Sequence, residues 1–164
     1  MTVHPNVQLL RDFFVAMQRL DKEALAAQFT IDARWWAPIS AEQRGLISRP
    51  LEGGAAVVEL LTTLMTQIYG PERTWTIQHV TADDETGAAH VELVTTLAGS
   101  GRPYRNTYAF FYQFVNGQIA DVWEFTDTEY SHGQFEEEAA RQASSDSNSA
   151  SSDSNSIVVS TGAH

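Results

Sequence analysis

The sequence predicts an α+β domain in which a curved, mostly antiparallel sheet wraps around three N-terminal helices, a cone with an internal pocket. Apolar residues recur at helical spacing in the first part of the chain and alternate with a period of two from Thr74 onward. Turn residues divide this second part into four consecutive strands. The 164 residues have the length of one domain and can bury a core without cross-links.

Two helices are predicted near the N-terminus. Asn6 is the expected N-cap of the first, whose apolar face is formed by Val7, Leu10, Phe14, Met17 and Leu20. The second covers Lys22 to Phe29 and follows Asp21, a residue type that caps helices well.

A short strand is predicted next, over Arg34 to Ala37, closed by Pro38. The third helix begins after Gly53-Gly54 and ends at Gly70-Pro71. Its apolar face is formed by Val57, Leu60, Leu61, Leu64 and Ile68.

Four strands rich in β-branched and aromatic residues follow, over residues 74–82, 88–98, 104–115 and 118–127. Asn116-Gly117 suits a type I′ turn and joins the last two strands in a tight hairpin. Beyond the predicted domain of residues 1–143, a repeated Ser/Asp/Asn segment indicates a flexible tail over residues 144–164.

Composition excludes several classes of function. The chain has no cysteine, which rules out disulfides, thiol nucleophiles and cysteine-ligated metal sites. Its net charge of −11, without a basic cluster, argues against nucleic-acid binding. We find no signal peptide, no long apolar span and no phosphate-binding loop, so we expect a cytoplasmic protein without membrane contact, cofactor or bound metal.

Alternation assigns side chains to the two faces of the sheet. One face carries Asn106, Tyr108, Phe110, Tyr112 and Phe114, followed by Ala120, Val122, Glu124 and Thr126. The other carries Phe111, Trp123 and Phe125. Because neither face is polar, we expect a pocket on one side and helices or a partner subunit on the other.

Two polar placements indicate acid–base chemistry. Glu124 lies in a strand otherwise suited to burial, and His90 and Glu92 share one face of their own strand. If these faces coincide, two carboxyls and an imidazole share an aromatic cavity, where their pKa values are pushed apart. A solvated Glu92 or Glu124 and a structural His90 remain alternatives, and only one of Trp35 and Trp36 can face the pocket.

The motifs together resemble a known family. They are Phe29–Pro38, Pro50-Leu51-Glu52-Gly53 before a helix, Tyr104-Arg105-Asn106-x-Tyr108, and Gly117-Gln118-Ile119 followed by Val122–Thr128. Over roughly residues 7–130 the chain looks like the SnoaL-like branch of the ketosteroid-isomerase and nuclear-transport-factor superfamily. The resemblance implies a cone of curved sheet and three helices that often forms dimers.

The resemblance also implies site residues. Where ketosteroid isomerases carry a tyrosine and a catalytic aspartate, this chain has Phe13 and Ala37, so that chemistry is disfavoured. His90-x-Glu92 and Glu124 match the Arg-x-Asp and Asp of limonene-epoxide-hydrolase-like members, although Trp35 and Ala37 replace their water-holding Tyr and Asn. Polyketide cyclases of the family place a carboxylate near the position of Glu124.

These observations predict a cofactor-independent acid–base enzyme acting on a hydrophobic, polyketide- or terpenoid-like molecule by cyclisation, isomerisation or epoxide opening. Glu124 is the expected principal acid/base, assisted by Glu92 and His90. The expected substrate contacts are Trp35, Trp36, Asn106, Tyr108, Phe110 and Tyr112. The alternative is a non-catalytic module that binds a lipophilic ligand or forms a homodimer.

Overall fold

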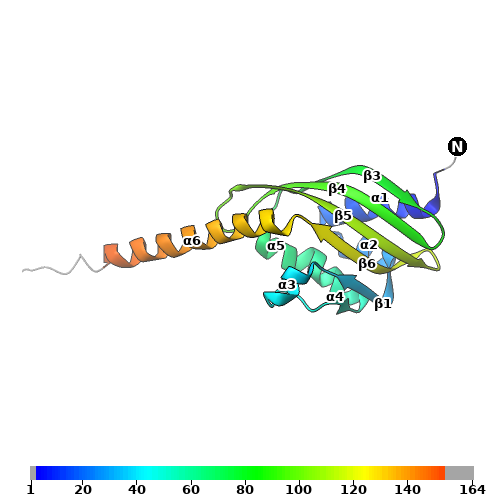
Figure 1. The fold of residues 1–164 in the computed structure, drawn as a ribbon, viewed down its shortest axis with the longest axis horizontal. Coiled ribbons are helices and arrows are strands. Elements are labelled where there is room, and N and C mark those ends of the chain that lie inside the picture. The colour runs from blue at the N-terminus through cyan, green and yellow to red at the C-terminus, as the bar shows by residue number, and fades with distance from the viewer. Residues whose placement is uncertain (1–2, 154–164) are drawn as a thin grey trace, which may run out of the picture.

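The computed structural model of the chain describes residues 3–153. One curved sheet is covered by helices, and a long C-terminal helix projects away from the domain (Figure 1). The helices are α1 (Pro5–Arg19), α2 (Lys22–Gln28), α3 (Ile39–Gln43), α4 (Gly54–Glu59), the π-helical η1 (Leu60–Leu64), α5 (Met65–Ile68) and α6 (Thr128–Asp153). The strands are β1 (Phe29–Trp36), β2 (Leu51–Glu52), β3 (Thr74–Ala82), β4 (Thr86–Thr96), β5 (Pro103–Val115) and β6 (Gln118–Thr126).

The strand order in the sheet is β2-β1-β6-β5-β4-β3. Strands β3 to β6 are antiparallel neighbours, whereas β1 runs parallel to β6 and antiparallel to β2. The predicted α+β fold with a curved, mostly antiparallel sheet is confirmed. The parallel pair is important for the site, because it brings Trp35 beside Val122 near the middle of the sheet.

The start of the chain differs from the prediction in two details. The N-cap of α1 is His4, whose Nδ1 accepts from the Asn6 backbone N–H at 3.2 Å. Asn6 itself is buried, and its Nδ2 donates to the carbonyl of Asp83 at 2.8 Å, which ties α1 to the turn between β3 and β4. The first strand is also longer than predicted, beginning at Phe29 directly after α2.

The third predicted helix contains a π-helical turn, η1, that shifts its apolar face. Val57 and Leu61 are buried as expected, but Leu64 and Ile68 are exposed. A π turn adds a residue to the helical repeat, so every side chain after it is rotated relative to the α-helical pattern. The predicted single face therefore ends at η1.

A β-bulge in β6 changes which residues face inward. Phe114 pairs with Ile119, but Gln113 pairs with Asp121, so Ala120 is an extra residue on β6. Ile119 precedes the bulge and pairs with the inward Phe114, so it lies buried on the inner face in place of the predicted Ala120. Beyond the bulge Val122 and Glu124 face inward.

Helix α6 packs its first turns against the domain. The ring of Phe135 stacks on Tyr104 at 5.8 Å, and Arg102 is paired with Glu137 at 2.6 Å. The helix continues through Asp153, across the predicted boundary after residue 143, and residues 154–164 of the predicted tail lie outside the described residues. No helix within residues 3–153 is long and apolar enough to cross a membrane.

Candidate acid–base site

Glu124 lies on the inner face of β6 as the cross-strand neighbour of Phe110. On the adjacent β1, the buried Trp35 faces the same side, and its Nε1–H donates to Oε2 of Glu124 at 2.9 Å. Oε1 of Glu124 has no hydrogen-bond partner in the described part of the chain. The carboxyl is therefore held by one oxygen and free at the other.

Burial gives this carboxyl an unusual acidity. The Glu124 residue is half-buried, and its carboxyl is surrounded by protein atoms. Burial raises the pKa of Glu124 from the ordinary 4.5 to about 7, and the hydrogen bond from Trp35 opposes this shift. At neutral pH both protonation states are populated.

Aromatic rings form the wall beside the carboxyl. The ring of Phe110 lies 5.7 Å from Trp35, 5.9 Å from Tyr108 and 6.2 Å from Tyr112. Trp75, on β3, lies 5.4 Å from Tyr108. Each of these rings except Trp75 is at most 4% exposed, so the side chains beside Glu124 form an apolar surface.

A chain of hydroxyl groups continues from this wall to α6. The hydroxyl of Tyr108 lies 3.2 Å from that of Tyr69 and 3.1 Å from that of Tyr104. Tyr104 in turn lies 3.1 Å from Oγ of Ser131, and Nδ2 of Asn106 donates to Ser131 at 2.6 Å. Asn106, predicted to contact substrate, is thus engaged in this chain.

The Tyr112 hydroxyl stands apart from the chain. It is buried and has no hydrogen-bond partner among the described residues. Burial, and secondly the charge of Glu124, raises the pKa of Tyr112 well above its usual value. Burial is also the main cause of the raised pKa of Tyr108, to which Glu124 again contributes.

His90 and Glu92 lie on the opposite face of the sheet from Glu124. Their neighbours on β5 are Ala109 and Thr107, whereas the buried Val91 pairs with Tyr108 on the inner face. The expectation that the two carboxyls and the imidazole share one cavity is wrong. The apolar residues of β4 take the inner positions, which forces the intervening polar residues outward.

Both outer residues have partners of their own. Glu92 accepts a hydrogen bond from Nε of Arg105 at 2.7 Å, and a terminal nitrogen of the same guanidinium lies 2.6 Å from the carboxylate as an ion pair. His90 is exposed, and its ring stacks on His79 at 5.9 Å.

Trp36 also lies on the outer face, as expected from its alternation with Trp35. Its ring stacks on Trp123 at 6.3 Å, and its Nε1–H donates to Asp121 at 3.0 Å. Asp121 is 3% exposed and is also paired with Arg34. The structure therefore groups Trp35, Tyr108, Phe110 and Tyr112 with Glu124 and separates Trp36 from them.

Sequence reasoning did not identify Tyr69, Tyr104 and Ser131 as neighbours of the site. Tyr69 follows α5 and Ser131 belongs to α6, so they reach β5 through tertiary packing. Tyr104 was detectable, because it precedes Asn106, Tyr108 and Tyr112 at the same period-two spacing on β5.

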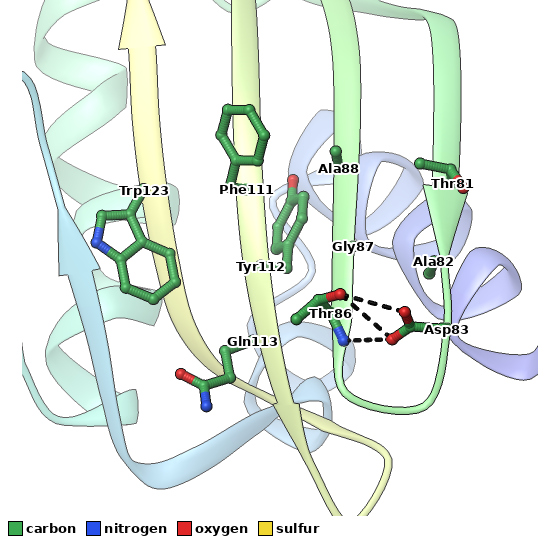
Figure 2. Close-up of a pocket in the computed structure, with 10 residues that line it drawn as sticks. All are labelled: Thr81, Ala82, Asp83, Thr86, Gly87, Ala88, Phe111, Tyr112, Gln113 and Trp123. Carbon is green, nitrogen blue, oxygen red and sulfur yellow. Dashed lines mark hydrogen bonds between the residues drawn. The ribbon is translucent and has the colours of Figure 1, made fainter.

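The two hollows described in the structure lie elsewhere. The larger, about 620 Å³, is on the outer face and is lined by Phe111, Gln113 and Trp123, with Thr86 and Asp83 at the turn between β3 and β4 (Figure 2). The smaller, about 380 Å³, lies against the first turns of α6. Within the described residues, no three carboxylate or histidine side chains cluster closely enough to hold a metal ion.

The chain matches a known protein family. The family model described as the SnoaL-like domain matches residues 10–122. No curated protein matches the chain.

Several solved structures have the same fold. An NTF2-like protein of unknown function from Burkholderia pseudomallei aligns with a TM-score of 0.68 and 21% identity, over 79% of this chain and 95% of its own. IdmH, a proposed polyketide cyclase from Streptomyces antibioticus, aligns with a TM-score of 0.67 and 18% identity, over 80% and 99%. An LEH-like epoxide hydrolase from M. tuberculosis aligns with a TM-score of 0.60 and 13% identity, over 76% and 84%. At these identities the likeness concerns the fold.

Proposed function

Because the chain belongs to the SnoaL-like domain family, we propose that Glu124 is the acid–base group of a cofactor-independent enzyme. The substrate is a hydrophobic, polyketide- or terpenoid-like molecule, and the reaction is a cyclisation, an isomerisation or an epoxide opening. The matched family and the named neighbours, which include a proposed cyclase and an epoxide hydrolase, support an enzyme of this type.

The observation that carries the proposal is a single buried carboxyl with a pKa of about 7 inside an aromatic wall. A group that titrates near neutral pH can both donate and accept a proton at useful rates, and such catalysis typically contributes about 10²–10⁴-fold. The free Oε1 is the atom that exchanges the proton, because Oε2 is held by Trp35.

The residues around Glu124 take supporting roles. Trp35 fixes the orientation of the carboxyl, and Phe110 with Tyr108 supplies an apolar surface. In its protonated form the carboxyl donates to a substrate oxygen; in its ionised form it takes a proton from carbon or from water. In a cyclisation or isomerisation the proton taken from the substrate is returned to it. In an epoxide opening water is the second reactant, and the proton given to the epoxide oxygen is recovered from the attacking water.

Replacement of Glu124 by Gln tests the proposal. The variant keeps the shape of the side chain and the contact with Trp35, so we expect a folded protein whose turnover of a polyketide- or terpene-epoxide-type substrate falls about 10²–10⁴-fold. The matched control is Glu85→Gln, which removes one exposed carboxylate from the loop between β3 and β4. Full turnover by the Glu124 variant would disprove the assignment.

A second candidate function is homodimer formation through the outer face of β4, β5 and β6. Phe111 and Phe125 are 51% and 55% exposed there, and their rings contact each other edge to face at 5.8 Å. The carboxylates of this face, Glu92 and Asp121, are each paired with an arginine. An acidic chain of net charge −11 can approach a second copy most easily at such a neutral face.

Sedimentation tests this association. We expect a dimer at micromolar concentration, converted to a monomer by Phe111→Ser, while the control Leu46→Ser, at another exposed apolar position, leaves the dimer intact. A monomer for the unmodified chain would refute the proposal.

A further inference from the structure

The inner face of the sheet has few hydrogen-bond donors left for a ligand. The indole N–H of Trp35 is already used on Oε2 of Glu124. The side-chain amide of Asn106 is also engaged, because its Oδ1 accepts from the Thr107 backbone while its Nδ2 donates to the carbonyl of Asp127 and to Ser131.

Each hydroxyl of the chain donates its proton to the next one, in a single direction that ends at α6. Ser131 Oγ donates its proton to the carbonyl of Asp127 at 2.9 Å, so it accepts from Tyr104. Tyr104, whose proton is thereby used, accepts from Tyr108, and Tyr108 accepts from Tyr69. Because each hydroxyl carries a single proton, the anchor on α6 orients the phenol protons of this chain toward Ser131.

The groups left over are therefore mainly acceptors. They are the free Oε1 of Glu124, the lone pairs of Tyr69 and the π faces of the surrounding rings. Among the described residues of this wall, the donors that remain are the Tyr112 hydroxyl and the indole N–H of Trp75. No lysine, arginine or histidine of the described residues pairs with Glu124. An ionised carboxylate in this position lacks the counter-charge that buried carboxylates ordinarily have.

From this surplus of acceptors we infer that the Glu124 site recognises a hydrophobic cation, an amine in its ammonium form or a quaternary ammonium compound. The positive group lies against the carboxylate of Glu124 and the rings of Phe110, Tyr108 and Trp35. Aromatic rings attract cations through their quadrupole, and this attraction adds to that of the carboxylate. The inference rests on the proposed function only in taking the Glu124 site as the place where substrate binds.

A pair of isosteric probes tests this inference without any turnover. Benzyltrimethylammonium and neopentylbenzene have the same shape and differ in charge, and choline and 3,3-dimethylbutan-1-ol form a smaller, more soluble pair. Calorimetric titration of the full chain at pH 8 should give at least tenfold tighter binding of the cation in each pair. At pH 5, where Glu124 is protonated, the preference should fall toward unity.

Two variants assign the preference to the site. Glu124→Gln should abolish it and leave binding of the neutral probe, whereas Glu85→Gln, which changes the net charge equally, should retain it. Equal affinity for both probes in the unmodified chain, no binding of either, or a preference that survives Glu124→Gln would each overturn the inference. Turnover of neutral substrates that depends on Glu124, without a preference for cations, would refute this inference and leave the proposed function standing. Binding of cations without any turnover would refute the proposed function and leave this inference standing.

Discussion

Two carboxyl–indole pairs lie on opposite faces of the same two strands. On the inner face Trp35 donates to Glu124 at 2.9 Å, and on the outer face the next residue, Trp36, donates to Asp121 at 3.0 Å. The donors are chemically identical and the distances nearly equal. What differs is Arg34, which binds both oxygens of Asp121 at 2.8 Å, whereas no cation of residues 3–153 pairs with Glu124.

This difference separates a structural carboxylate from a reactive one. Arg34 neutralises Asp121, and Arg34 and Trp36 together bind its carboxylate, so these contacts hold β1 to β6. Glu124 keeps a free oxygen and a raised pKa because burial acts on it without a cation nearby. A buried carboxyl is thus best interpreted from its partners.

The largest expected effect concerns stability against pH. Folded Glu124 has a pKa of about 7 against an ordinary 4.5, so the folded chain keeps a proton that the unfolded chain releases. Its stabilising contribution is complete below about pH 4.5, declines as the pH rises to about 7, and is then lost, a total of about 3 kcal/mol. Urea unfolding of the unmodified chain and of Glu124→Gln between pH 4 and 8 measures this as their difference, and parallel pH profiles would contradict it.

Breaking the outer pair comes next. Asp121→Asn removes the charge that holds Arg34 and leaves the amide to face the guanidinium, and we expect a loss of about 2 kcal/mol in the free energy of unfolding. The pH dependence of turnover should be the same as in the unmodified chain, because Glu124 lies on the other face of the sheet. A shift of that dependence would show that the two faces are coupled through β6.

Matched removal of the two indole donors sharpens the comparison. Trp35→Phe and Trp36→Phe should each cost about 1–2 kcal/mol of stability through a lost hydrogen bond to a charged group. Only Trp35→Phe should also raise the pKa of Glu124, because its hydrogen bond lowers that pKa. The pH at which activity changes with the protonation of Glu124 should then be higher in Trp35→Phe than in the unmodified chain. An identical shift of that pH in both variants would refute the distinction.

The smallest effect is expected at the exposed ion pair of the outer face. The Arg105 side chain is 70% exposed, so its pairing with Glu92 is screened by solvent, and Arg105→Gln should change stability by less than about 1 kcal/mol. Thermal unfolding at low and high salt measures this, and a loss of several kcal/mol would show that the pair is structurally required.

Local sequence patterns predicted the helices and strands, but not which faces of neighbouring strands lie on the same side of the sheet. Period-two alternation located β3 to β6 closely, and it already contained the correct faces of β4, since Val91 and Leu93 are the apolar set. The expectation of a shared cavity was wrong because it required the face of His90 and Glu92 to coincide with that of Glu124, whereas the buried Val91 and Leu93 occupy the inner face of β4.

Irregular backbone explains the remaining differences. The π turn η1 and the bulge at Ala120 each insert one residue into a regular repeat, and neither carries a distinctive residue type. The hydroxyl chain was likewise inaccessible, because Tyr69 and Ser131 join it only through the packing of α5 and α6.

The bulge at Ala120 also decides which of the two carboxyls faces the interior. The tight turn at Asn116-Gly117 sets the register at the start of β6, and the extra residue shifts that register by one from Asp121 onward. If the same residues paired without the bulge, Asp121 would turn inward and Glu124 outward. Deletion of Ala120, by contrast, would make the strand regular and leave both carboxyls on their present faces. The position of the reactive group therefore depends on a match between the number of residues in β6 and its backbone geometry, and a change in only one of the two would exchange the carboxyls.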